Sequence, residues 1–173
     1  MSDGAGSSSS NWLWCVLNDQ HLALADAAAT RMAENAANLG PNPRYAHTPD
    51  QRYQRVLGMQ GEVAFRVVTG LPLPTVDELT STWKDADVDG YAVKTISKPT
   101  YDLRFDDSDL PPAHTLVLML NQSPPRIALL GTISIQRALA VRRWGKQLPR
   151  PTWLVDKRYL EPWPLDDRFV VDF

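Results

Sequence analysis

The sequence predicts a mixed α+β domain in which a central sheet of three to five strands follows two helices and precedes another helix. Two observations support this class. Apolar residues recur with a helical period in the first seventy residues, and after Pro74 the pattern changes to the two-residue period of strands. Helices followed by consecutive strands are typical of α+β or mixed α/β domains rather than doubly wound ones.

The first part of the chain contains the two predicted helices. Residues 11–17 are a short aromatic and aliphatic run that fits either a strand or a buried turn. A helix is expected over 19–39, where alanine, leucine and methionine form one stripe. A second helix is expected from Thr48, a good N-cap followed by Pro49 and by Gln51, to about Thr69.

Two glycines, Gly58 and Gly61, interrupt the second predicted helix. Each glycine costs a helix about 1 kcal/mol relative to alanine, so a close neighbour is expected at this point. The sequence leaves two causes open, which are tight helix–sheet packing and a functional site.

The second part of the chain contains the predicted strands. They are expected over residues 87–96, 101–105, 115–121 and 126–133. The continuously apolar run from Thr115 predicts a central strand that is buried on both faces. A helix is expected over 134–143, and irregular structure after it with a possible strand over 169–173.

The length of 173 residues fits one domain. We expect a disordered tail over residues 1–10 and a single domain over 11–173, with a core at about 49–143 and a proline- and tryptophan-rich appendage at 144–173. No apolar run approaches the roughly 20 residues of a membrane span, and no secretory signal is visible, so we expect a cytoplasmic protein without a membrane partner. Cys15, the only cysteine, is expected to be a small buried hydrophobe, and the three histidines lack the spacing of a zinc site.

Acidic residues and one lysine surround the start of the first predicted strand after the helices. Carboxylates hold the magnesium ions that promote phosphodiester cleavage, and a nearby lysine can orient the attacking water. An acid and a lysine two residues apart on a strand point to the same face. The candidate residues are Glu62, Asp85, Asp87, Asp89 and Lys94.

The chain resembles the PD-(D/E)XK nuclease superfamily, particularly its small phage-type members. The matching residues are Gly61-Glu62-Val63-Ala64 in the helix and then Asp87, Gly90, Val93, Lys94 and Thr95. The resemblance covers about residues 49–143 and implies a restriction-endonuclease-like core. It also implies Glu62, Asp87 and Lys94 as catalytic residues, with Glu62 and Asp87 as metal ligands and DNA as the substrate. We expect the metal to be Mg or Mn and add Asp89, from the predicted hairpin turn, as a candidate ligand.

One position departs from the family pattern. Ala92 stands two residues before Lys94, where the family has an acid or a glutamine, and alanine cannot bind a metal. Asp89 or Asp85 could substitute, Glu62 and Asp87 could suffice, or the fold could serve binding alone. One possibility is that the fold is unrelated to nucleases and the motif matches are accidental. If the fold is nuclease-like, two functions remain open. One is a metal-dependent DNA phosphodiesterase, and the other is a catalytically inactive nuclease-fold protein that binds a protein or nucleic-acid partner.

Basic residues gather near the end of the last predicted helix. Arg137, Arg142, Arg143 and Lys146 are candidates for nucleic-acid binding, with Arg150 and an interleaved Trp144 nearby. The alternative is a solvated helix end that is favoured by the helix dipole. Trp153, Tyr159 and Trp163 are expected to pack against the body of the domain. The net charge of −2 argues against a broadly basic nucleic-acid surface.

Overall fold

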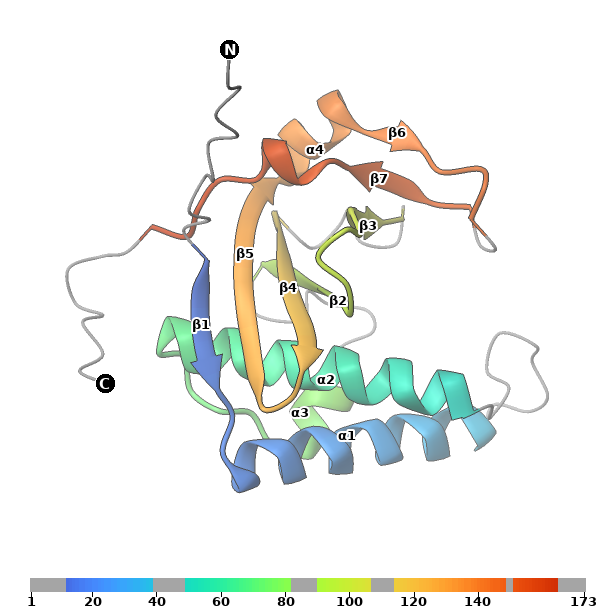
Figure 1. The fold of residues 1–173 in the computed structure, drawn as a ribbon. Helices are drawn as coiled ribbons and strands as arrows, with labels where there is room; N and C mark the ends of the chain where they lie inside the picture. Colours follow the sequence, from blue (N-terminus) through green and yellow to red (C-terminus); the bar gives the residue numbers. More distant parts are fainter. Residues whose placement is uncertain (1–11, 39–48, 82–89, 107–113, 149–150, 165–173) are drawn as a thin grey trace, which may run out of the picture.

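The computed structural model describes residues 12–38, 49–81, 90–106, 114–148 and 151–164. Its helices and strands confirm the mixed α+β class (Figure 1). In chain order the elements are β1 (Leu13–Val16), α1 (Asp19–Asn38), α2 (Pro49–Thr69), α3 (Val76–Ser81), β2 (Tyr91–Ile96), β3 (Leu103–Phe105), β4 (Thr115–Ser123), β5 (Arg126–Ser134), α4 (Ile135–Val141), β6 (Arg143–Trp144), β7 (Trp153–Val155) and a 3-10 turn (Lys157–Tyr159).

The main sheet has four strands in the order β1-β5-β4-β2. β2 runs parallel to β4, whereas β4 with β5 and β5 with β1 are antiparallel pairs. The five residues from Leu116 to Leu120 in β4 are all buried, as the apolar run predicts for a central strand. β2 forms one border of the sheet within the part of the chain that the structure describes.

A second, three-stranded sheet has the order β3-β7-β6. The strand predicted at 101–105 is thus present as β3, but it pairs with β7 instead of extending the main sheet. The other two strands are β6 and β7, although we expected a helix up to residue 143 and irregular structure after it, and α4 in fact ends at Val141. Leu103 and Phe105 drive this arrangement, because both are buried against the main sheet while Arg104 between them points outward.

Three local predictions have clear outcomes. The run at 11–17 forms the strand β1, and α1 and α2 lie where the apolar stripes place them. The helix α3 was not expected, although its signal is present in the sequence. Thr75 and Glu78 form a capping box, in which the Thr75 backbone N–H donates to the Glu78 carboxylate at 2.6 Å and the Glu78 N–H donates to Thr75 Oγ1 at 3.2 Å. The predicted tail, the Thr48 cap, the start of the strand predicted at 87–96 and the strand at 169–173 lie outside the described residues.

Two apolar clusters occupy the two faces of the main sheet. The first joins α1 and α2 to the face that carries Val93, Val117 and Met119. The second joins β3, β7 and α4 to the face that carries Ala92 and Leu118. Figure 1 shows α1 and α2 at one end of the molecule and the second sheet with α4 at the other. Among the described helices, none combines the length and the apolar character needed to cross a bilayer.

Candidate functional site

The helix α2 touches the strand β2 at a glycine. A Cβ atom built on Gly61 would come within 1.9 Å of Thr95 Oγ1, so only glycine allows this approach. One helical turn later, the ring centroids of Phe65 and Tyr91 lie 5.4 Å apart. Because Gly61 meets Thr95 and Phe65 meets Tyr91, α2 runs antiparallel along β2.

The rotation of α2 about its axis determines the direction of Glu62. Gln60 faces the neighbouring strand β4, where the Asn121 side-chain amide donates to Gln60 Oε1 at 2.7 Å. Successive helical side chains are about 100° apart, and Gly61 faces β2. Glu62 therefore points the other way from Gln60, past β2 toward the border of the main sheet. Glu62 as a whole is only 7% exposed.

Gly58 lies on the same side of α2 as Glu62 and has open space around its Cα. Gly58 precedes Glu62 by one helical turn, and a Cβ atom built on Gly58 would meet no atom of the described structure within 4 Å. The two glycines of α2 therefore need different structural explanations. Helix–sheet packing explains Gly61 and does not explain Gly58, where an added Cβ would contact nothing in the part of the chain that the structure describes.

Lys94 starts from the other face of β2. Tyr91 and Val93 pack in the cluster under α2, and Thr95 meets Gly61, so side-chain alternation directs Lys94 away from α2. Ala92 shares the face of Lys94 and is 4% exposed within the second apolar cluster. Glu62 and a half-buried Lys94 therefore approach the border strand from opposite faces, and they can converge only around its edge.

The acidic part of the predicted site precedes β2. Asp85, Asp87 and Asp89 lie outside the described residues, and the described chain resumes at Gly90. Within the described ranges, no three histidine, cysteine, aspartate or glutamate side chains gather closely enough to hold a metal ion. Of the predicted ligands, the structure describes only Glu62, whose carboxylate oxygens are of the kind that Mg²⁺ and Mn²⁺ prefer.

The four basic residues predicted to bind nucleic acid have different surroundings. Arg137 pairs with Glu161, and Arg143 Nη2 donates to Asp102 Oδ2 at 2.5 Å, so a neighbouring carboxylate compensates each of these charges. The Arg142 guanidinium lies over the Trp153 ring at 4.1 Å from its centroid, and Lys146 is exposed. This region therefore holds two cations that no carboxylate of the described chain pairs, Arg142 and Lys146.

The remaining aromatic and thiol predictions concern packing. Trp163 contacts Phe65 edge-on, with centroids 5.3 Å apart, and Tyr91 at 5.6 Å, which confirms its structural role. Trp153 and Tyr159 pack partly buried against the second cluster. Cys15 is buried as expected, and desolvation by burial raises the pKa of its thiol to about 11.

Comparison of the chain with models of protein families, with curated proteins and with solved structures finds no match in any of the three.

Proposed function

We propose that this protein is a metal-dependent DNA phosphodiesterase whose site lies at the border strand β2. The observation that carries the proposal is the buried Glu62 carboxylate, which α2 aims past β2 beside the space at Gly58. A carboxylate that the fold buries near the border of a sheet is a candidate metal ligand, because the charge of a bound cation offsets the cost of removing the carboxylate from water.

Each residue has a role in this proposal. Glu62, with Asp87 and Asp89 from the segment that leads into β2, would hold Mg²⁺ or Mn²⁺. The bound ion would polarise the phosphate and lower the pKa of an attacking water. Lys94 would reach around the edge of β2, orient that water and stabilise the negative charge that develops on the phosphate oxygens.

The proposal is tested with supercoiled, linear duplex and single-stranded DNA in the presence of Mg²⁺ or Mn²⁺. We expect the wild-type chain to cleave at least one form, and Glu62→Gln and Lys94→Ala each to reduce the rate at least 100-fold. Glu34→Gln is the matched control, because Glu34 is an exposed glutamate of α1. Intact DNA of every form with both ions would refute the proposal, and full activity of Lys94→Ala would refute the role of the lysine.

A second candidate function is binding of a protein or nucleic-acid partner without catalysis. The burial of Ala92 in the second apolar cluster favours it, because the position that the family pattern gives to an acid is here part of the core. This candidate predicts that divalent metal does not stabilise the fold. A rise of several degrees in Tm with Mn²⁺ that is lost in Asp87→Ala would exclude it, since a ligand stabilises only the state that binds it.

A further inference from the structure

The second sheet and its connections concentrate positive charge. The segments 98–104 and 142–158 contain eight lysines and arginines against two aspartates, whereas the whole chain has a net charge of −2. The rest of the chain is therefore net acidic, whereas these two segments carry a net positive charge that attracts a polyanion.

Tyr101, just before β3, lies at the centre of one group in this region. Arg104 lies over its ring at 5.4 Å from the centroid, and Lys98 at 5.7 Å. Lys157 anchors the backbone of this segment, because its Nζ donates to the backbone oxygens of Pro99 at 2.5 Å and Tyr101 at 2.8 Å. Tyr101, which is 36% exposed, is thus presented to solvent on an anchored backbone.

Trp144 in β6 lies at the centre of a second group. It is 50% exposed, which is unusual for so large an apolar side chain. Its ring meets that of Trp153 in a T-shaped contact, with centroids 4.7 Å apart, and Arg142 covers Trp153. The two tryptophans are cross-strand partners and therefore lie on one face of the sheet.

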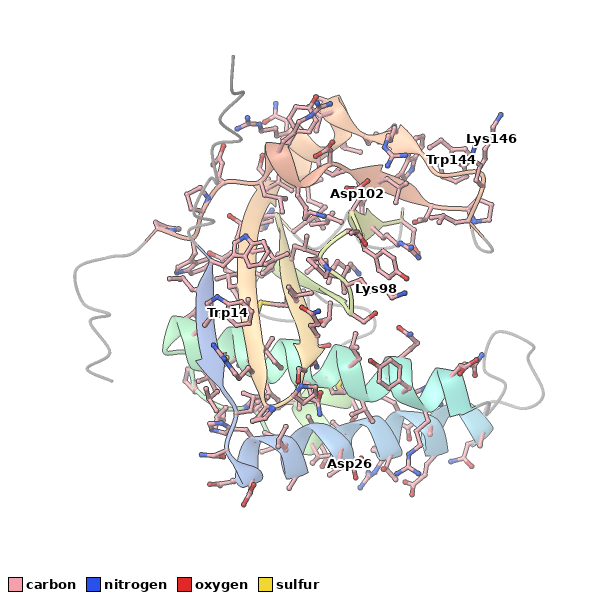
Figure 2. The ribbon with its side chains drawn as sticks, viewed as in Figure 1. Trp14, Asp26, Lys98, Asp102, Trp144 and Lys146 are labelled. Carbon is pink, nitrogen blue, oxygen red and sulfur yellow. The ribbon has the colours of Figure 1, made fainter. Side chains whose placement is uncertain are left out.

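An ion pair joins the two groups. Arg143 Nη2 bonds Asp102 Oδ2 at 2.5 Å, which ties the residue before Trp144 to the residue after Tyr101. Figure 2 shows Asp102 between Lys98 and the pair formed by Trp144 and Lys146, all toward the same side of the view. The register places the two groups on different faces of the second sheet, because Trp144 and Trp153 pair in line with Phe105 on the face toward the main sheet, whereas Arg104 points to the other face. We call the two groups together the aromatic–cationic surface; its members are Lys98, Tyr101, Arg104, Arg142, Trp144 and Lys146. A ligand that touches both groups therefore has to be flexible enough to pass around the border of this sheet.

The cations of this surface are available to an incoming anion. Within the described chain, Arg104 and Arg142 contact aromatic rings and form no ion pair with a carboxylate. A guanidinium that stacks on a ring still directs its N–H groups outward along its edge, where a phosphate oxygen can accept them.

We propose that the aromatic–cationic surface binds single-stranded nucleic acid. Exposed Trp144 and Tyr101 offer rings on which unpaired bases can stack, while Lys98, Arg104, Arg142 and Lys146 neutralise the phosphates. Duplexes are poorer ligands, because their bases already stack on each other. The inference deepens the proposed function, on which it rests for the reaction, by assigning a single-stranded substrate. Binding without metal nevertheless tests it separately from cleavage.

The test is fluorescence anisotropy of labelled twenty-nucleotide oligomers with the full chain in EDTA. Oligo-dT and oligo-rU measure binding to DNA and to RNA, and a duplex of equal length measures the preference for unpaired bases. We expect single strands to bind at least tenfold more tightly than the duplex, with an affinity that falls as salt rises.

Variants locate the binding. Trp144→Ala and Tyr101→Ala should each raise the Kd for oligo-dT about tenfold, and Trp144→Phe should restore most of the affinity because it keeps an aromatic face. Arg104→Met and Arg142→Met should also flatten the salt dependence. The matched control is Trp14→Ala in β1. Trp14 is 42% exposed and lies under Arg126 at 5.4 Å, away from the surface (Figure 2).

Three outcomes would overturn the inference. They are no binding of either single strand by the wild-type chain at low salt, unchanged affinity in the folded variants Trp144→Ala and Tyr101→Ala, and an equal loss in Trp14→Ala. Binding of an acidic peptide but of neither oligonucleotide would assign the surface to a protein partner instead. Oligonucleotide binding without cleavage in Mg²⁺ or Mn²⁺ would uphold this inference and count against the phosphodiesterase.

Discussion

Gly61 of α2 lies so close to Thr95 of β2 that any side chain at position 61 would collide with the threonine hydroxyl. This contact sets the distance between the helix and the strand. Together with the hydrogen bond between Gln60 and Asn121, it also sets the rotation of α2 that turns Glu62 toward the border of the sheet.

The two glycines of α2 should respond oppositely to alanine. We expect Gly61→Ala to lower the free energy of unfolding by about 1–3 kcal/mol, because the added methyl group overpacks the contact with Thr95. Gly58→Ala should raise it by about 0.5–1 kcal/mol, since alanine favours the helix and meets open space. Urea unfolding measures both values, and a destabilised Gly58→Ala would show that the space at Gly58 is filled.

The hydrogen bond between Asn121 and Gln60 should have a measurable coupling energy. We expect Asn121→Ala to cost about 1–3 kcal/mol, because it removes a partner inside a buried site. A double-mutant cycle with Gln60→Ala isolates the pair and should give a coupling of about 0.5 kcal/mol or more. If the losses in the free energy of unfolding of the two single variants simply add in the double variant, this hydrogen bond does not fix the rotation of α2 about its axis.

Placing an acid two residues before Lys94, as Ala92→Glu, should destabilise the fold. The new carboxyl would lie in the second apolar cluster, where burial raises its pKa above the value of about 4.3 in an unfolded chain. The cost is therefore smallest below that pH and grows as the pH rises. We expect a loss of about 2 kcal/mol or more at pH 7.5 and less at pH 4, measured by urea unfolding.

The control for this prediction is Ala140→Glu at an exposed position of α4, which should cost little at either pH. Equal losses for Ala92→Glu at the two pH values would show that the new carboxylate reaches solvent at the edge of β2. That result would favour a site that an acid at position 92 could complete.

The capping box of α3 should make stability depend on acid pH. Hydrogen bonds from the Thr75 backbone N–H and hydroxyl hold the pKa of Glu78 below its ordinary value of 4.5. A lowered pKa means that the stabilisation is present at neutral pH and is lost as the pH falls through the folded-state pKa. Glu78→Gln should therefore lower Tm at pH 7 and have less effect near pH 3. A pH-independent difference would contradict this account, and Glu34→Gln serves as the exposed control.

Cys15 should react only when the chain unfolds. With a pKa of about 11, only about one thiol in a thousand is ionised at pH 8, and the group is also shielded from reagents. We expect an aromatic disulfide reagent to label the native protein at least 100-fold more slowly than the protein in guanidinium. Rapid labelling of the native state would mean that β1 separates readily from α2.

The helices and the central strand follow from local signals in the sequence. The apolar stripes of α1 and α2, and the continuous apolar run of β4, depend on residues near each other in the chain, so the sequence predicts them. The capping box of α3 is equally local and marks a helix that the strand-like pattern after Pro74 concealed.

The arrangement of the strands depends on pairings between distant segments. The alternation of apolar and polar residues over 101–105 predicts a strand but does not identify the strand that pairs with it. That strand is β7, about fifty residues later in the chain. The candidate site has the same limit. The sequence places Ala92 and Lys94 on one face of β2, but tertiary packing puts that face against the second apolar cluster and turns Glu62 to the opposite one. The physical reason is that side-chain alternation and helix periodicity are local, whereas the face that becomes buried depends on which distant elements pack there.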